Sequence, residues 1–163
     1  MYNMALDDLP IKLPQTVTKM VLSNVKSSKQ TLFPELMHLE TVNLQGMDID
    51  DIPDQLPTSI KTFNLYDTRF SKDVSLAAFQ NLHDVFMKDT IMLVAHLIQM
   101  MGELEQLPKL AVFELVKCKL YPMNEIYQIE QRIKSSSCFR LNNSILIDSD
   151  SSISLTCSRL GKG

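Results

Sequence analysis

Apolar residues recur along the chain in short triplets. Two residues separate the first apolar position from the second and one separates the second from the third, as in Leu39-x-x-Val42-x-Leu44. The same pattern occurs at Val17–Leu22, Ile60–Leu65, Leu82–Met87 and Leu110–Leu115, and more weakly at Ser136–Leu141. An apolar–polar–apolar ending alternates with period two, which is typical of a β-strand with one buried side. The pattern therefore predicts about six short strands.

The triplets are also evenly spaced. Their middle residues lie 21 or 22 positions apart for the first four triplets, and 28 and 26 positions apart for the last two; they are Met20, Val42, Phe63, Val85, Phe113 and Phe139. A fixed period indicates one structural unit that is repeated. A single strand cannot bury its own apolar side, so we expect the units to stack with their strands parallel.

The segments between the strands lengthen along the chain. Asp50–Gln55 has room for little more than a turn, whereas Met92–Glu105 is predicted to be a buried helix. Residues 122–134 are predicted to be an amphipathic helix that starts at Pro122 and carries Ile126, Ile129 and Ile133 on one face. The last segment, 148–163, is rich in serine, and its alternating Ile153 and Leu155 leave open whether it is a final strand or a tail.

With these residues, the chain from Leu13 to Leu146 resembles a leucine-rich repeat protein, whose unit is LxxLxLxx(N/C)xL with a period of about 20–29 residues. The resemblance implies an α/β solenoid, with a curved parallel sheet on the concave side and short turns, then helices, on the convex side. It divides the chain into about six repeats over 1–147 and a C-terminal strand or tail over 148–163. The consensus Asn is replaced by Val25, Met47, Thr68, Thr90 and Ser144, while Cys118 fits the cysteine variant.

Composition narrows the classes of function. A net charge of −3, with 16 basic and 19 acidic side chains and no block of like charges, argues against a nucleic-acid partner. The four glycines do not cluster into a phosphate-binding loop. Three cysteines without a CxxC spacing fit a reducing intracellular setting, cytoplasmic or nuclear. The apolar run Ile91–Leu97 is too short to span a bilayer, so no membrane partner is expected. Residues 1–14 lack the basic leader of a signal peptide.

Catalytic and metal-binding patterns are missing from the sequence. No GxSxG motif occurs, and His38, His83 and His96 lie outside known catalytic motifs. Cys138 is the one thiol expected on the concave face and the only candidate nucleophile. The acidic patch of Asp48, Asp50, Asp51 and Asp54 lacks the glycine and the closing Glu of a calcium loop. We therefore expect no catalytic residues, no cofactor and no metal, and rank an enzyme below a binding protein.

The predicted concave face has the composition of a binding surface. The early strands place small polar groups there, such as Thr41, Asn43 and Gln45, whereas the later strands combine aromatic, aliphatic and charged residues. Such a mixture is typical of the centre of protein interfaces, although a solvated sheet face is the alternative. The predicted partner-binding residues are Asn64, Tyr66, Asp67, Asp84, Phe86, Lys88, Val112, Glu114, Val116 and Arg140.

The favoured function is a noncatalytic protein-binding module that recognises or scaffolds a partner through its concave face. The segment Phe33–Leu39 and the irregular periods resemble the repeat region of F-box substrate receptors, which implies target selection for a cullin-RING ubiquitin ligase. Asp7–Pro10 is similar to the start of an F-box, but the repeats begin directly afterwards and leave no room for its helices. A stand-alone adaptor or a subunit of a larger assembly is therefore preferred, and a pathogen effector is a further alternative.

Overall fold

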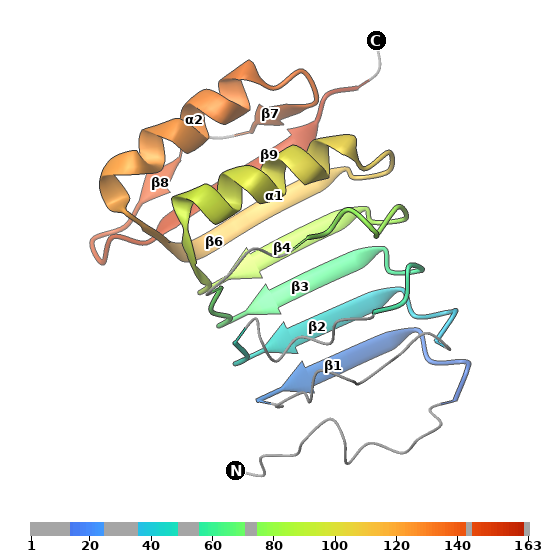
Figure 1. The fold of residues 1–163 in the computed structure, drawn as a ribbon. Helices are drawn as coiled ribbons and strands as arrows, with labels where there is room; N and C mark the ends of the chain where they lie inside the picture. Colours follow the sequence, from blue (N-terminus) through green and yellow to red (C-terminus); the bar gives the residue numbers. More distant parts are fainter. Residues whose placement is uncertain (1–13, 25–35, 49–55, 71–74, 143–144, 162–163) are drawn as a thin grey trace.

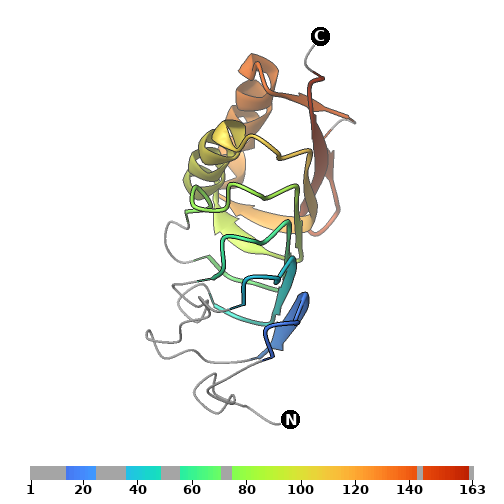
Figure 2. The same cartoon turned by 90° about the vertical axis from the view of Figure 1, so that its right-hand side faces the viewer.

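The computed structural model has an α/β architecture, with one mixed sheet and two α-helices that lie on one side of it, over its C-terminal strands (Figures 1 and 2). It describes residues 14–24, 36–48, 56–70, 75–142 and 145–161. The strands are β1 (Lys19–Ser23), β2 (Thr41–Gln45), β3 (Thr62–Tyr66), β4 (Asp84–Lys88), β5 (Ile91–Leu93), β6 (Val112–Tyr121), β7 (Phe139–Leu141), β8 (Leu146–Ile147) and β9 (Ile153–Arg159). The helices are α1 (Val94–Gln106) and α2 (Ile126–Ser135), and a 3₁₀ turn, η3 (Met123–Glu125), precedes α2.

Five strands stack in sequence order as parallel neighbours, β1-β2-β3-β4-β6. Their register joins the middle residues of the triplets, because Met20 pairs with Val42, Val42 with Phe63, Phe63 with Val85 and Val85 with Phe113. The parallel strands and the alignment predicted from the first five triplets are therefore confirmed. Figure 1 shows the resulting ladder of arrows that all point the same way.

The triplet residues form the core. Leu39, Ile60, Leu82 and Leu110, which open four of the triplets, have no exposed surface. Three methionines also belong to this core, with Met20 8% exposed and both Met87 and Met92 1% exposed. Because the strand residues alternate between buried and accessible, one side of every parallel strand contributes to a continuous apolar layer, on the side of the sheet where the helices lie.

Each parallel strand is followed by, or in β6 interrupted by, one residue in the left-handed backbone region. These residues have φ between 49° and 61° and are Asn24, Gly46, Asp67, Asp89 and Lys117. Asn and Asp tolerate this conformation better than other side chains. At Gly46 a Cβ would also lie 2.2 Å from Asn24 Oδ1, so any other residue there would require the Asn24 carboxamide to move. The same backbone turn is therefore repeated five times.

One residue after this turn, a buried polar atom bonds to the backbone. The hydroxyls of Thr68 and Thr90 donate to the carbonyls of Tyr66 and Lys88, both at 3.3 Å. The Cys118 thiol donates to the Met87 carbonyl at 3.4 Å. These are three of the positions at which the expected Asn is missing, so a short hydroxyl or thiol meets part of the backbone's hydrogen-bonding need there.

Both predicted helices are present, with shifted starts. The helix expected from Met92 begins at Val94, because Ile91–Leu93 forms β5 and pairs with the second half of β6. In α2, Ile126, Ile129 and Ile133 are buried as predicted, but Pro122 precedes the 3₁₀ turn instead of opening the helix. The turn expected over Asp50–Gln55 lies outside the described residues.

The prediction of a sixth parallel strand next to β6 is wrong. β9 occupies that place, runs antiparallel to β6 and separates it from β7. β9 buries Ile153, Leu155 and Cys157 along seven residues, whereas β7 has only three residues. The longer apolar side covers more of β6, so the segment 148–163, for which a strand or a tail was expected, contains a strand inside the sheet.

Two valines on neighbouring strands separate the effect of burial from that of strand propensity. Val42 has no exposed surface, whereas Val21 is 55% exposed on the other side of the sheet. We expect Val42→Ala to lower the free energy of unfolding by about 2 kcal/mol, from two lost methyl groups and the cavity they leave. Val21→Ala should change it by less than about 0.5 kcal/mol. Chemical denaturation checks both, and equal losses would contradict the assigned sides of the strands.

Lys117 provides a test of the left-handed turn. With φ of 51°, its side chain is strained where glycine would not be. We expect Lys117→Gly to raise the free energy of unfolding by about 1 kcal/mol. Lys119→Gly, two residues further along β6, should instead lower it by about 0.5–1 kcal/mol because glycine weakens a strand. Thermal or urea unfolding distinguishes the two, and a destabilised Lys117→Gly would argue against this turn.

Candidate partner-binding face

The residues of the parallel strands that point away from the core form one broad surface, which we call the open face. No described helix or strand lies over it, since both helices pack on the opposite side of the sheet (Figure 2). The parallel register arranges its residues in three rows across β1, β2, β3, β4 and β6. The rows are Lys19, Thr41, Thr62, Asp84 and Val112; Val21, Asn43, Asn64, Phe86 and Glu114; and Ser23, Gln45, Tyr66, Lys88 and Val116.

Nine of the ten predicted partner-binding residues lie together on this surface. Asn64 and Tyr66 are on β3, Asp84, Phe86 and Lys88 on β4, and Val112, Glu114 and Val116 on β6, while Asp67 follows β3 at the rim. The tenth, Arg140, is on β7 opposite Ser158 of β9, so one strand separates it from β6. The structure therefore brings the candidates from β3, β4 and β6 together and sets Arg140 apart.

Phe86 lies at the centre of this group and is half-buried, not exposed as the sequence suggested. Asn64 and Glu114 are its register partners on the two neighbouring strands. Register partners in a sheet are about 4.8 Å apart, so their side chains lie next to the ring. Phe86 therefore contributes a partly sheltered apolar centre within a polar surrounding.

The two asparagines of the middle row form a side-chain pair. Asn64 Nδ2 donates to Asn43 Oδ1 at 2.7 Å. This bond fixes both carboxamides along the row and uses only one of the four hydrogens that the two groups carry. The remaining donors and acceptors lie on the open face, where a partner can reach them, and those of Asn64 lie beside Phe86.

The charged groups at the centre of the open face have few partners within the described chain. No ion pair among the described residues involves Asp84 or Lys88, and Glu114 accepts only a long hydrogen bond of 3.5 Å, from the Thr156 hydroxyl. By contrast, Glu40 and Lys61 form an ion pair of 2.6 Å just before β2 and β3 begin. The central charges are therefore free to interact with another molecule.

Strand β9 adds three polar residues that the sequence did not assign to this face. Ser154, Thr156 and Ser158 alternate with the buried Ile153, Leu155 and Cys157, and Thr156 and Ser158 pair with Glu114 and Val112. Alternation of this kind was visible in the sequence. The missing information was the strand that β9 pairs with, because the pairing spans more than 35 residues, as in the bond from Lys117 N to Ser154 Oγ.

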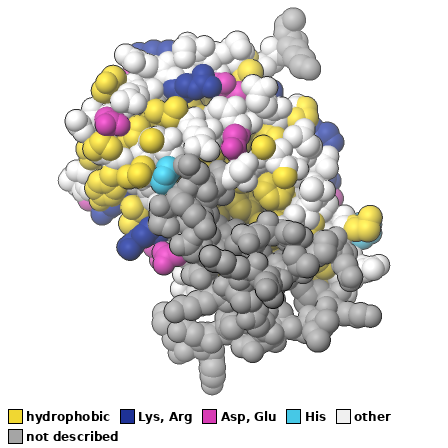
Figure 3. Space-filling view, viewed as in Figure 1, with side chains coloured by type: hydrophobic (Ala, Val, Ile, Leu, Met, Phe, Trp, Pro, Cys, Tyr) yellow, Lys and Arg dark blue, Asp and Glu magenta, His cyan; other side chains and the backbone are white. Residues whose placement is uncertain are grey.

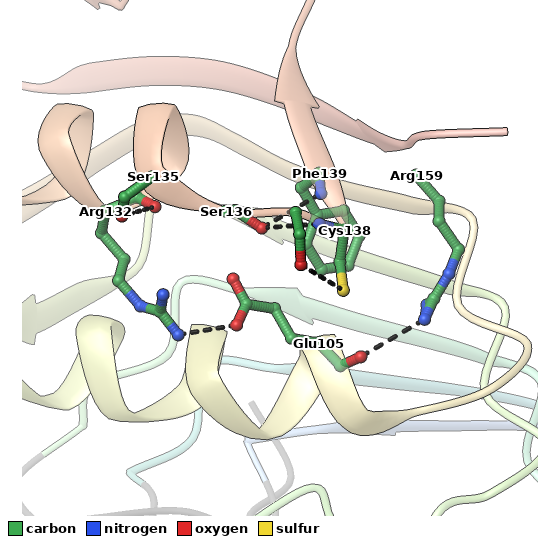
Figure 4. Close-up of polar contacts among 8 residues, drawn as sticks. Glu105, Arg132, Ser135, Ser136, Cys138, Phe139 and Arg159 are labelled. Carbon is green, nitrogen blue, oxygen red and sulfur yellow. Dashed lines mark hydrogen bonds and ion pairs between the residues drawn. The ribbon is translucent and has the colours of Figure 1, made fainter. Parts of the chain in front are cut away.

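On the helix side, a second polar cluster ties α1, α2 and β9 together (Figure 4). Arg132 of α2 forms an ion pair with Glu105 of α1 at 2.7 Å. Arg159 of β9 donates to the carbonyls of Glu105, Leu107 and Leu110 at 2.8–3.3 Å. A cation at the carboxyl end of a helix is favourable because the unpaired carbonyls there carry partial negative charge. The cluster therefore holds the two helices and β9 together, and Arg159 bonds to the carbonyls at the carboxyl end of α1.

Two of the three thiols are buried in the core. Burial raises the pKa of both Cys118 and Cys157 to about 11, since both lie in the core and desolvation disfavours the thiolate. Cys138, the candidate nucleophile, packs partly against the core and lies 3.8 Å from Ser137 Oγ. Within the described ranges, no three His, Cys, Asp or Glu side chains gather closely enough to hold a metal ion. Asp48 is the one described member of the predicted acidic patch and is exposed.

Apolar side chains are also visible on the helix side, where they gather beside the starts of α1 and α2 (Figure 3). Leu93 and Tyr121, 45% and 48% exposed, are register partners at the ends of β5 and β6.

Neither α1 nor α2 is long and apolar enough to cross a membrane. No protein-family model matches the chain, and the curated proteins include no significant match.

The different environments of the three thiols lead to a labelling prediction. At pH 8, we expect one thiol in the native protein to react readily with dithionitrobenzoate, namely the half-buried Cys138, because the other two are buried. Cys138→Ser should remove this reaction, and unfolding in guanidinium should release all three thiols in the original chain. Absorbance at 412 nm follows the reaction, and rapid labelling that persists in Cys138→Ser would contradict the burial of Cys118 and Cys157.

Proposed function

We propose that the chain is a degenerate leucine-rich repeat protein whose open face binds another protein without catalysis. The support for the family comes from three repeated features. The parallel strands follow one apolar triplet pattern, each carries a left-handed residue at the same place, and a buried Thr or Cys occupies three of the consensus Asn positions. On this proposal the open face is the concave side of a solenoid.

The observation that carries the binding function is the centre of the open face. Phe86 is surrounded by charged groups that form no ion pair among the described residues and by Tyr66, Val112 and Val116, and no described element covers them. Interfaces typically concentrate binding energy in aromatic residues at the centre of a patch that a polar rim surrounds. Strands about 4.8 Å apart also make five neighbouring strands wide enough for a partner domain or segment. The free thiols support an intracellular location, cytoplasmic or nuclear, because thiols stay reduced in these compartments.

Site-specific photo-crosslinking tests this function. We expect p-benzoylphenylalanine at Tyr66, on the open face, to give a discrete crosslinked product in cells that naturally encode the sequence. The same group at Tyr127, which is 56% exposed on α2, is the matched control and should not give that product. Phe86→Asp should abolish the Tyr66 product because it places a charge at the apolar centre. Gel shifts and mass spectrometry of the product provide the measurement.

Two outcomes would contradict the proposal. One is the same product from both crosslinking positions, and the other is a Tyr66 product that survives Phe86→Asp in a folded chain. Circular dichroism and Tyr127→Asp, a charge added on the helix side, check that folding and general charge effects are not responsible. The crosslinked protein also tests the narrower alternatives: cullin-RING subunits or their targets would support an F-box type receptor, and a host protein would support a pathogen effector.

A further inference from the structure

We propose that the open face binds a basic segment of its partner, with an arginine side chain held by Asp84, Phe86 and Glu114. This inference rests on the proposed function and specifies the chemistry of the partner. The three side chains lie on the same side of two neighbouring strands: Asp84 and Phe86 are two residues apart on β4, and Glu114 is the register partner of Phe86 on β6. Along its strand the aromatic ring is thus flanked by Asp84 on one side and Lys88 on the other, and across the sheet it faces a second carboxylate, that of Glu114, so two acids and one base lie next to it.

This arrangement suits a cation for two independent reasons. A guanidinium is attracted to an aromatic ring, and the attraction strengthens when the ring is partly shielded from water, as the half-buried Phe86 is. The same guanidinium has five donors in one plane, so it can bond to carboxylates on two sides while stacking on the ring. A lysine ammonium can satisfy the charge, but it lacks this planar geometry.

The charge of the surrounding surface favours the same partner. The centre and rim of the open face on β3, β4 and β6 carry four acids, Asp67, Asp84, Asp89 and Glu114, against two bases, Lys88 and Lys117, which leaves a local charge of −2. No ion pair among the described residues neutralises these acids. Lys19 and Arg140 lie at the two ends of the sheet, on β1 and β7. The negative charge at the centre of the open face therefore favours a positively charged segment of the partner.

The apolar residues around the site indicate what should lie next to the arginine. Val112 and Val116 are the residues on either side of Glu114 along the open face of β6, and Tyr66 lies diagonally from Phe86 on β3. Each is half-buried. Diagonal neighbours in a sheet are within reach of long side chains, so an aliphatic or aromatic residue adjacent to the arginine can pack on them. The inferred partner segment combines arginine with such a residue.

Four peptide libraries provide the test. Each consists of heptapeptides with six randomised positions and a fixed central residue, which is arginine, its neutral analogue citrulline, lysine or glutamate. Fluorescence polarisation against the full chain should give about tenfold tighter binding for arginine than for citrulline or glutamate, with lysine in between. The difference should vanish in Asp84→Asn/Glu114→Gln. Glu130→Gln on α2, at an exposed acid on the other side of the sheet, is the control and should keep it.

Equal binding of the arginine and citrulline libraries would overturn the inference, as would an arginine preference that survives Asp84→Asn/Glu114→Gln. A failure of all four libraries to bind the original chain would overturn it as well. Phe86→Leu should retain binding but reduce the preference for arginine, because it keeps an apolar side chain and removes the aromatic ring. The crosslinking experiment at Tyr66 is separate, so a discrete product there, combined with any of these failures, would retain the binding face and reject only its basic partner.

Discussion

A strand with a single apolar side is stable only when other apolar sides lie beside it, and this requirement determines most of the molecule. The paired positions of Met20, Val42, Phe63, Val85 and Phe113 satisfy it, because they place one buried residue of every parallel strand in the same row. A shift of one residue at any strand would turn its apolar side outward. The open face is the other half of this arrangement. The row that contains Phe86 and Glu114 exists only because the buried residues on the other side of the same strands are aligned.

Much of the fold could be predicted because its information is local and repeated. Residue spacing alone identified the five parallel strands, their register and the buried isoleucines of α2. The start of α1 could not be placed, because Ile91–Leu97 is a nearly continuous apolar run. In such a run the sequence pattern does not distinguish a short strand from the first turns of a helix. The position of β9 depends on pairing between residues far apart in the sequence. The alternating pattern of its residues indicates a strand but not the strand with which it pairs.

The candidate site was predictable to a similar extent. Period two assigns a side of the sheet to each strand residue, so the eight candidates on β3, β4 and β6 lie where the pattern placed them, and Asp67 follows in the turn after β3. Burial was less predictable, because the accessible surface of Phe86 depends on Asn64 and Glu114, which belong to other strands. Arg140 was placed beside β6 because the sixth triplet was treated like the others, although β9 lies between them.

The direction of β9 limits where the array of parallel strands can grow. A repeat adds one strand to an exposed edge, and the edge of β6 is already paired with a strand that runs the other way and that α1 holds through Arg159. Duplication of a unit beyond β6 would break this pairing, whereas duplication among β1 to β4 would only insert another parallel strand of matching register. Variation in the length of such a protein is therefore expected on the amino-terminal side of β6, with the antiparallel end kept constant.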